Sequence, residues 1–157
     1  MTRDELTRKI LSIKRAKRLT WKAIVAEIGG GSAVYLTAAL MGQMKLRPEQ
    51  AERAAGELGL RIAREIYADR AYDNTGNLVS RKLPGAVLHE PEEAAARVQA
   101  MVREGAIISN SGKRIPVAID TVCVHGDNPA AVAMAGLVRD KLEQAGIAVR
   151  PMAETVG

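Results

Sequence analysis

The sequence predicts an α/β protein that begins with an all-helical bundle and continues with a segment of alternating strands and helices. Three observations indicate this organisation. Residues 1–47 carry short helical patterns with capping residues, residues 48–157 add β-branched runs and turn residues, and apolar residues make up 47% of the 157 residues. That apolar share is typical of globular proteins and argues against disorder. We therefore expect two parts, residues 1–47 and 48–157, joined between residues 45 and 62.

The helices of the first ~60 residues are marked by capping residues. Thr2 and Glu5 have the spacing of a capping box, and Thr20 is placed to cap a second helix that ends at the glycine run 29–31. Ser32 begins a third helix, which continues through Met41. Pro48 suits the first turn of a fourth helix, and Gly59 lies beyond its end.

The second part opens with a short strand at Ile66 and Tyr67, followed by a turn at residues 74–77. Pro91 begins an alanine-rich helix that stops at Gly105. The apolar residues on either side of the polar turn 110–112 predict a β-hairpin of residues 107–108 and 115–119.

A strand at residues 121–124 precedes the tetrapeptide His-Gly-Asp-Asn, and Pro129 begins the last long helix. We expect the inward face of this helix to carry four apolar residues, Val132, Ala135, Val138 and Leu142. Gly146 ends the helix before a strand at residues 147–149. A strand, a helix and a strand in this order predict a βαβ unit with a parallel pair.

The net charge of +5 resides in the first 60 residues, and four of the basic side chains are close together: Lys14, Arg15, Lys17 and Arg18. Such a cluster forms either a solvated helix face or a contact with nucleic acid. Helices 20–28 and 33–41 have the layout of a helix-turn-helix motif. The second of them lacks the arginine, lysine and amide side chains that read base edges, so we expect no nucleic-acid reading and assign it to packing or to a homo-oligomer interface.

Composition excludes several other classes of function. A single cysteine, Cys123, supplies no internal disulfide, and two histidines with one cysteine make no zinc pattern. No apolar run reaches the length of a membrane span, and acidic residues follow Met1, so we expect a cytoplasmic protein without a membrane contact. The glycine run 29–31 lacks the Lys-Ser/Thr of a phosphate loop.

Two residues after the strand at 121–124 are candidate catalytic groups. His125 and Asp127 lie between a strand end and a helix start, where α/β folds bind ligands. An imidazole moves protons near neutral pH, so His125 is a candidate acid or base. The alternatives are a structural histidine and an aspartate that only caps the helix.

Asp69 and Arg70 likewise follow a strand, and Arg81 lies in the next loop. We expect Arg70 to bind a carboxylate, with Asp69 orienting it and Arg81 adding positive charge to the same rim. The alternative for Asp69 and Arg70 is an ordinary surface salt bridge.

The sequence resembles two known families in turn. Residues 5–58, above all TWKAIVAEIGGGSAVYLTAALMGQMKL, resemble the N-terminal helical domain of cyanase, which implies an assembly role. The catalytic domain of cyanase is missing, so we do not expect cyanate decomposition. The segments IAREIYADRAY, LVSRKLPGAVLHEPEEA and DTVCVHGDNPAAVAMA resemble the C-terminal part of the LamB/YcsF family, whose members are the A subunits of 5-oxoprolinase.

The second resemblance implies a TIM-like fold and the ATP-dependent opening of 5-oxoproline to glutamate, carried out with partner subunits. A complete TIM barrel needs about 250 residues, and the chain from Pro48 onward has fewer than half of that. We therefore expect a partial TIM-like segment fused to a cyanase-type domain, with a site that is incomplete within a single chain. The alternative is a non-enzymatic assembly or DNA-associated module.

Overall fold

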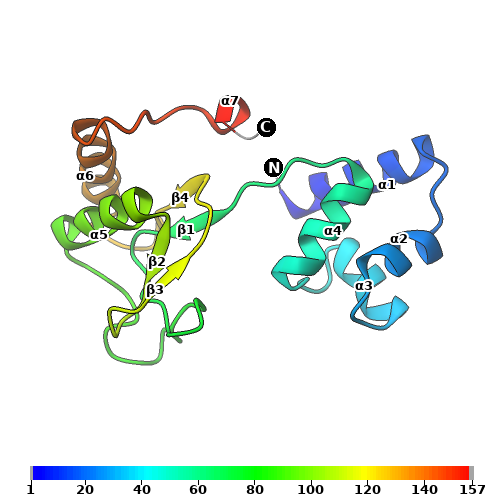
Figure 1. Ribbon diagram of the computed structural model, residues 1–157, viewed down its shortest axis with the longest axis horizontal. Helices are drawn as coiled ribbons and strands as arrows, with labels where there is room; N and C mark the ends of the chain where they lie inside the picture. The colour runs from blue at the N-terminus through cyan, green and yellow to red at the C-terminus, as the bar shows by residue number, and fades with distance from the viewer. Residues whose placement is uncertain (1, 156–157) are drawn as a thin grey trace. The chain divides into compact units, whose positions relative to one another are not determined.

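The protein is described by a computed structural model that covers residues 2–155. The chain forms two compact units, Met1–Ile62 and Ala63–Gly157, each with its own hydrophobic core (Figure 1). The first unit is helical, and the second combines helices with two small sheets. The mixed α/β class predicted from the sequence is confirmed.

Four helices make up the first unit, and their bounds are α1 Arg3–Ala16, α2 Trp21–Ile28, α3 Ala33–Leu40 and α4 Pro48–Leu58. The predicted caps are present. Thr2 and Glu5 form a reciprocal capping box, and the hydroxyls of Thr20 and Ser32 accept hydrogen bonds at the starts of α2 and α3. Gly59 ends α4 with φ +66°, a left-handed conformation that glycine adopts without a Cβ penalty.

The boundary between the compact units lies after Ile62, at the far end of the range 45–62 in which we expected the join. This position has a packing reason: α4 packs against α2, and its Ala54 and Leu58 belong to the helical core.

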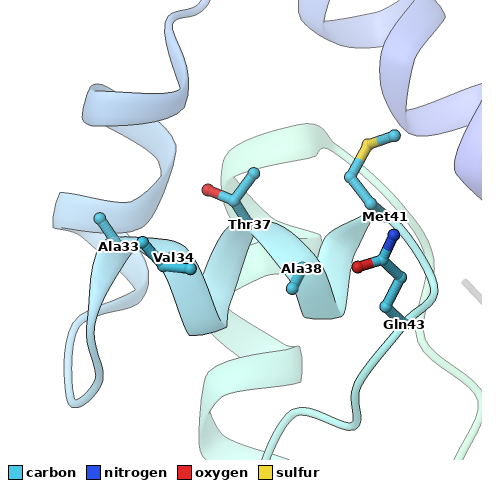
Figure 2. A pocket seen from close by; sticks show the side chains of 6 residues that line it. All are labelled: Ala33, Val34, Thr37, Ala38, Met41 and Gln43. Carbon is cyan, nitrogen blue, oxygen red and sulfur yellow. The ribbon is translucent and has the colours of Figure 1, made fainter.

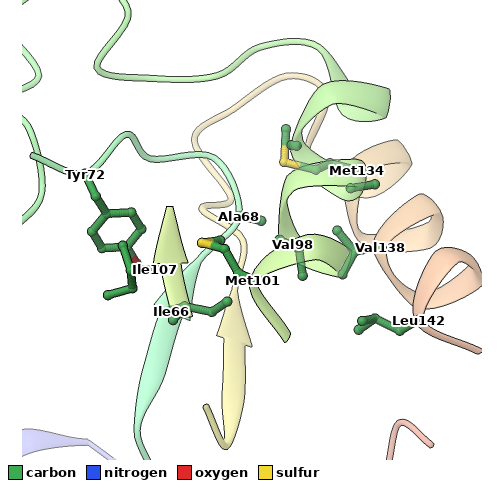
Figure 3. Close-up of a cluster of buried hydrophobic side chains, with 11 residues drawn as sticks. Ile66, Ala68, Tyr72, Val98, Met101, Ile107, Met134, Val138 and Leu142 are labelled. Carbon is green, nitrogen blue, oxygen red and sulfur yellow. The ribbon is translucent and has the colours of Figure 1, made fainter. Parts of the chain in front are cut away.

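The second unit contains four strands and three helices, with bounds β1 Glu65–Tyr67, α5 Pro91–Glu104, β2 Ala106–Ile108, β3 Arg114–Pro116, β4 Thr121–Cys123, α6 Ala131–Gln144 and α7 Met152–Thr155. β1 pairs with β4 in parallel, and β2 pairs with β3 as an antiparallel hairpin. Helices α5 and α6 pack against each other and supply much of the core, including Val98, Met101, Met134 and Val138 (Figure 3).

Two strand predictions need correction. Residues 147–149 form no strand, because the Ile147 amide donates to the Leu142 carbonyl and closes the end of α6. The parallel partner of β4 is therefore β1. The hairpin strand ends at Pro116 rather than at residue 119, because the amides of Asp120 and Thr121 already donate to the Arg64 carbonyl beside β1.

Helix α6 also differs from the prediction. It begins at Ala131 rather than at Pro129, and its inward residues are Met134, Val138 and Leu142. Val132 is 88% exposed. Ala135, the other residue that we expected to point inward, is exposed as well. The buried positions follow an i, i+4, i+8 spacing, which places one residue per turn against α5.

Within residues 2–155, none of the helices taken singly is long and apolar enough to cross a membrane. The pair α2 and α3, which meet at a bend of 102°, passes the same test of length and composition together.

Candidate functional site

The candidate site forms where the parallel strands β1 and β4 end. Tyr67 and Cys123 are partners in the strand register, and the pairing continues as the Ala68 amide donates to the Cys123 carbonyl at 2.9 Å. Asp69 and His125 each lie two residues further along. Because parallel strands end at the same edge of a sheet, the register itself brings these two side chains together.

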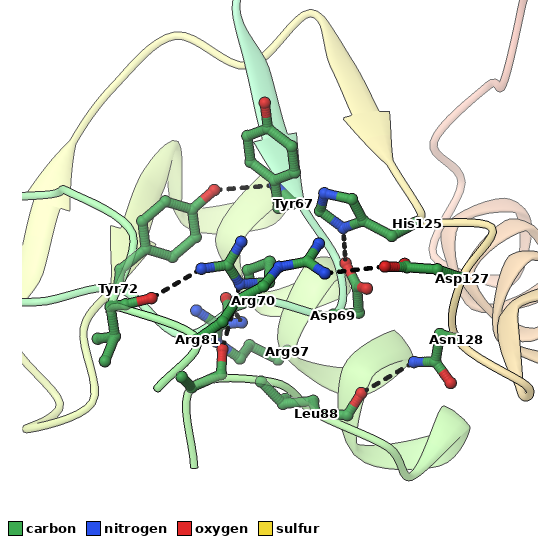
Figure 4. A network of polar contacts seen from close by, with 12 residues as sticks. Tyr67, Asp69, Arg70, Tyr72, Arg81, Leu88, Arg97, His125, Asp127 and Asn128 are labelled. Carbon is green, nitrogen blue, oxygen red and sulfur yellow. Dashed lines mark hydrogen bonds and ion pairs between the residues drawn. The ribbon is translucent and has the colours of Figure 1, made fainter. Parts of the chain in front are cut away.

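Asp69 and His125 form a direct side-chain contact (Figure 4). Oδ1 of Asp69 lies 2.7 Å from Nδ1 of His125. The Asp69 side chain is 1% exposed and the His125 side chain 22% exposed, so the carboxylate is enclosed and the imidazole reaches the surface. Since a buried carboxylate needs a partner, Asp69 orients the imidazole and favours the proton on Nδ1.

The ring of Tyr67 covers one face of the His125 imidazole. The two ring centroids are 5.2 Å apart and the planes differ by 15°. Burial, followed by the neighbouring Glu65 carboxylate, raises the pKa of the Tyr67 phenol. Among the described residues, Nε2 of His125 has no hydrogen-bond partner, so this nitrogen is available to exchange a proton with a ligand.

Arg70 is buried and serves the loop that follows it. Its Nη2 donates to the Val79 carbonyl at 2.7 Å and its Nε to the Ala86 carbonyl at 3.3 Å. The side chain is therefore engaged with backbone oxygens, and a carboxylate-binding role for Arg70 stays a prediction. Asp69 and Arg70 are 1% and 7% exposed, so the alternative of an ordinary surface salt bridge is wrong.

The segment that carries Asp69 is held by two residues that sequence reasoning missed, Tyr72 and Arg97. Arg97 donates to the Arg70 carbonyl at 2.8 Å, and its guanidinium carbon lies 5.3 Å from the centre of the Tyr72 ring. The Tyr72 hydroxyl accepts from the Tyr67 amide at 2.8 Å. Burial raises the pKa of Tyr72 and lowers the pKa of Arg97. Sequence reasoning missed Arg97 because an arginine on an alanine-rich helix has no local pattern that indicates a contact with a distant backbone carbonyl.

Arg81 and Asp127 form a second contact near the first. Nη1 of Arg81 lies 2.8 Å from Oδ2 of Asp127, and the side chains are 46% and 66% exposed. The hydrogen bond and charge of Arg81 hold the pKa of Asp127 below its ordinary value. Asp127 does not cap α6: the residue before this helix is Ala130, whose amide donates to Asn128.

The chain is similar to known proteins of one family. A model of the LamB/YcsF family matches residues 26–157. The chain belongs to the LamB/YcsF family. Its relatives include the A subunit of 5-oxoprolinase from Rhodopseudomonas palustris strain CGA009, 57% identical over 64% of this chain, and that from Gluconobacter oxydans, 50% identical over 77% of this chain.

A solved LamB/YcsF-type structure agrees with the fold. It is described as the lactam utilization protein from Thermus thermophilus, is 29% identical, and aligns with a TM-score of 0.62 over 96% of this chain and 68% of its own. The chain spans 40% of the Rhodopseudomonas protein and 48% of the Gluconobacter protein. The family match begins within α2, inside the segment that resembles cyanase, and that resemblance stays a prediction.

The family resemblance implies ATP, and the glycine run 29–31 is the segment whose composition resembles a phosphate loop. The carbonyls of Gly29 and Gly30 accept from Gln50, and the Gly30 carbonyl also accepts from Arg47. A phosphate cradle needs converging amide hydrogens, and this run presents carbonyls to its neighbours. The run does not fit ATP. Residues 2–155 also contain no group of three or more His, Cys, Asp or Glu placed to hold a metal ion.

The basic cluster of this LamB/YcsF chain is partly engaged within the helical unit. Nζ of Lys14 lies 5.2 Å from the centre of the Trp21 ring, and Nζ of Lys17 donates to the Glu57 carbonyl at the end of α4. Arg15 and Arg18 are exposed, and Arg18 follows α1 with φ +54°. A nucleic-acid role for these four residues stays a prediction.

Proposed function

We propose that the Asp69–His125 pair is the acid and base of a lactam-opening reaction of the 5-oxoprolinase type. The observation that carries this proposal is the 2.7 Å contact between an enclosed carboxylate and a partly exposed imidazole at the ends of two adjacent parallel strands. The relatives are named as 5-oxoprolinase A subunits and as a lactam utilization protein, and these names support the choice of a lactam as the substrate class.

In the proposed reaction, water adds to the lactam carbonyl and the ring C–N bond breaks. His125 accepts a proton from the attacking water at Nε2 and returns it to the departing ring nitrogen, so the proton count balances. Asp69 stabilises the imidazolium that forms between these two transfers. This division of work needs a carboxyl group beside Nδ1, and Asp69 places one there at 2.7 Å.

We assign the substrate carboxylate to Arg81. This guanidinium is half-exposed and its present partner, Asp127, is an exposed carboxylate. A ligand carboxylate takes the place of Asp127 at little cost, because exposed ion pairs contribute little. Arg70, whose donors go to Val79 and Ala86, then shapes the loop that carries Arg81.

The complete activity, on this proposal, belongs to an assembly. We place ATP with the partner subunits, as the family resemblance implies. This chain covers 40% of the Rhodopseudomonas relative, so on this proposal a neighbouring chain completes the site. The helical unit, with its cyanase-like sequence, serves self-assembly in this scheme.

The test is turnover of 5-oxoproline with ATP, measured with and without partner 5-oxoprolinase subunits. We expect glutamate formation by the wild-type chain in the presence of the partners and a loss of about a hundredfold or more in His125→Asn. His89→Asn is the matched control, because His89 is the other histidine and lies exposed before α5. Full activity in His125→Asn contradicts the proposal.

A second candidate, an assembly module without catalysis, is favoured by the surface of α3. Val34 is 81% exposed and borders a shallow hollow of about 480 Å³ whose lining is mainly apolar, formed by Ala33, Val34, Thr37, Ala38, Met41 and Gln43 (Figure 2). Exposed apolar patches often mark interfaces. Mass measurement in solution tests this candidate: we expect a homo-oligomer that Val34→Asp dissociates, and a monomeric wild-type chain contradicts it.

A further inference from the structure

We propose that Tyr67 is a positioning residue that fixes the plane of the His125 imidazole and thereby directs Nε2. This inference deepens the proposed function and rests on it for the catalytic consequence. The evidence is the stacked geometry, with centroids 5.2 Å apart and planes 15° from parallel, next to a hydrogen bond on the edge of the same imidazole.

The two contacts of His125 restrict different motions. The hydrogen bond to Asp69 restrains the position of Nδ1, and small coupled rotations about the Cα–Cβ and Cβ–Cγ bonds of His125 still let the ring pivot about this contact. A pivot moves Nε2, which lies on the far side of the ring. The flat face of Tyr67 opposes that pivot, because offset stacked rings lose contact when one of them tilts. Asp69 and Tyr67 together therefore define the direction of Nε2.

Tyr67 is itself held in place by its surroundings. It lies on β1, its register partner in β4 is Cys123, and its amide donates to the Tyr72 hydroxyl at 2.8 Å. The Tyr72 ring contacts the Arg97 guanidinium, and Arg97 donates to the Arg70 carbonyl next to Asp69. The same layer of side chains thus supports both groups that contact His125 (Figure 4).

The first test is NMR of the carbon-bound ring protons of His125 in the intact chain. Only two histidines are present, so His89→Asn assigns the signals. We expect the His125 protons to lie upfield in the wild type and in Tyr67→Phe, because the aromatic ring current acts on them. In Tyr67→Ile they move downfield while the His89 signals stay in place. Unchanged His125 signals in Tyr67→Ile overturn the proposal.

Isoleucine suits a strand position, which favours a folded variant. If Tyr67→Ile does not fold, Tyr67→Trp replaces it, since the larger ring current of an indole moves the same protons further upfield. Absence of that additional shift overturns the proposal. Tyr35→Leu is the matched control, because Tyr35 lies on α3 and its hydroxyl donates to the Lys45 carbonyl within the helical unit.

The second test is the kinetics of 5-oxoproline turnover with ATP and the partner subunits. We expect Tyr67→Ile to lower kcat by roughly tenfold with KM nearly unchanged, and Tyr67→Phe to restore wild-type kcat. Equal losses in Tyr67→Phe and Tyr67→Ile overturn the positioning role of the ring. If the wild-type assembly itself fails to open 5-oxoproline, the proposed function is wrong, and the NMR spectra still decide whether Tyr67 holds His125.

Discussion

Two of the polar contacts that the segment after β4 makes with the first half of its unit differ in their surroundings. Asp69 and His125 meet at the strand ends, where the carboxylate is 1% exposed. Arg81 and Asp127 meet at the surface, where the side chains are 46% and 66% exposed. The contact set by strand register encloses its carboxylate, whereas the loop contact of similar length is open to exchange with solvent or a ligand.

The largest expected effect comes from the enclosed contact. Asp69→Asn keeps the shape of the side chain and removes its charge, so the imidazolium loses its stabilising partner. We expect turnover to fall by about a hundredfold or more and the free energy of unfolding to drop by about 2 kcal/mol. Turnover assays and chemical denaturation measure the two quantities. Asp140→Asn, at an exposed position of α6, is the matched control, and turnover within a few-fold of wild type in Asp69→Asn contradicts this account.

The next effect concerns Arg70, which supports the loop between the two contacts. Arg70→Met removes the side-chain donor to the Val79 carbonyl and leaves the Ala86 carbonyl with the Ala71 amide alone, and we expect the free energy of unfolding to fall by about 2–3 kcal/mol. Arg139→Met is the control: Arg139 is 59% exposed and pairs with Glu143 on α6, so its loss costs within about 0.5 kcal/mol. Equal destabilisation of the two variants in urea denaturation argues against a supporting role for Arg70.

The smallest effect on stability comes from the exposed contact. Arg81 lowers the pKa of Asp127, so the contribution of this pair to stability is present at neutral pH and is lost as the pH falls through that lowered pKa. In Arg81→Gln we expect the pKa of Asp127 to rise toward the ordinary value of an aspartate, measured by NMR titration of its carboxyl carbon. An unchanged midpoint contradicts the contact. On the proposed function, the same variant raises KM for 5-oxoproline.

The sequence predicts the helix ends well and the contacts between distant strands poorly. Capping residues and glycines located the helices, because these signals act within one turn of the chain: Thr2, Ser32 and Gly105 all lie where the structure ends or begins a helix. Asp69 and His125 were both identified as residues that follow strands. Their contact was not predicted, because it depends on β4 pairing with β1 rather than with residues 147–149.

Long-range contacts account for the other differences. Val132 has the apolar character of a core residue, yet the packing of α6 against α5 turns it outward. Arginine is a residue type that commonly binds carboxylates, which is why we expected that role for Arg70. Its contacts with the Val79 and Ala86 carbonyls form only when the loop 78–88 folds over it. Neither outcome is encoded in local spacing.

A double-mutant cycle on turnover tests the central claim most directly, with Asp69→Asn, His125→Asn and the combined variant assayed in the presence of ATP and the partner subunits. If Asp69 acts through the imidazole of His125, the combined variant is no slower than His125→Asn alone, since the partner of Asp69 is already missing. If the two losses multiply, the residues act independently and the account of an Asp69–His125 acid–base pair is wrong.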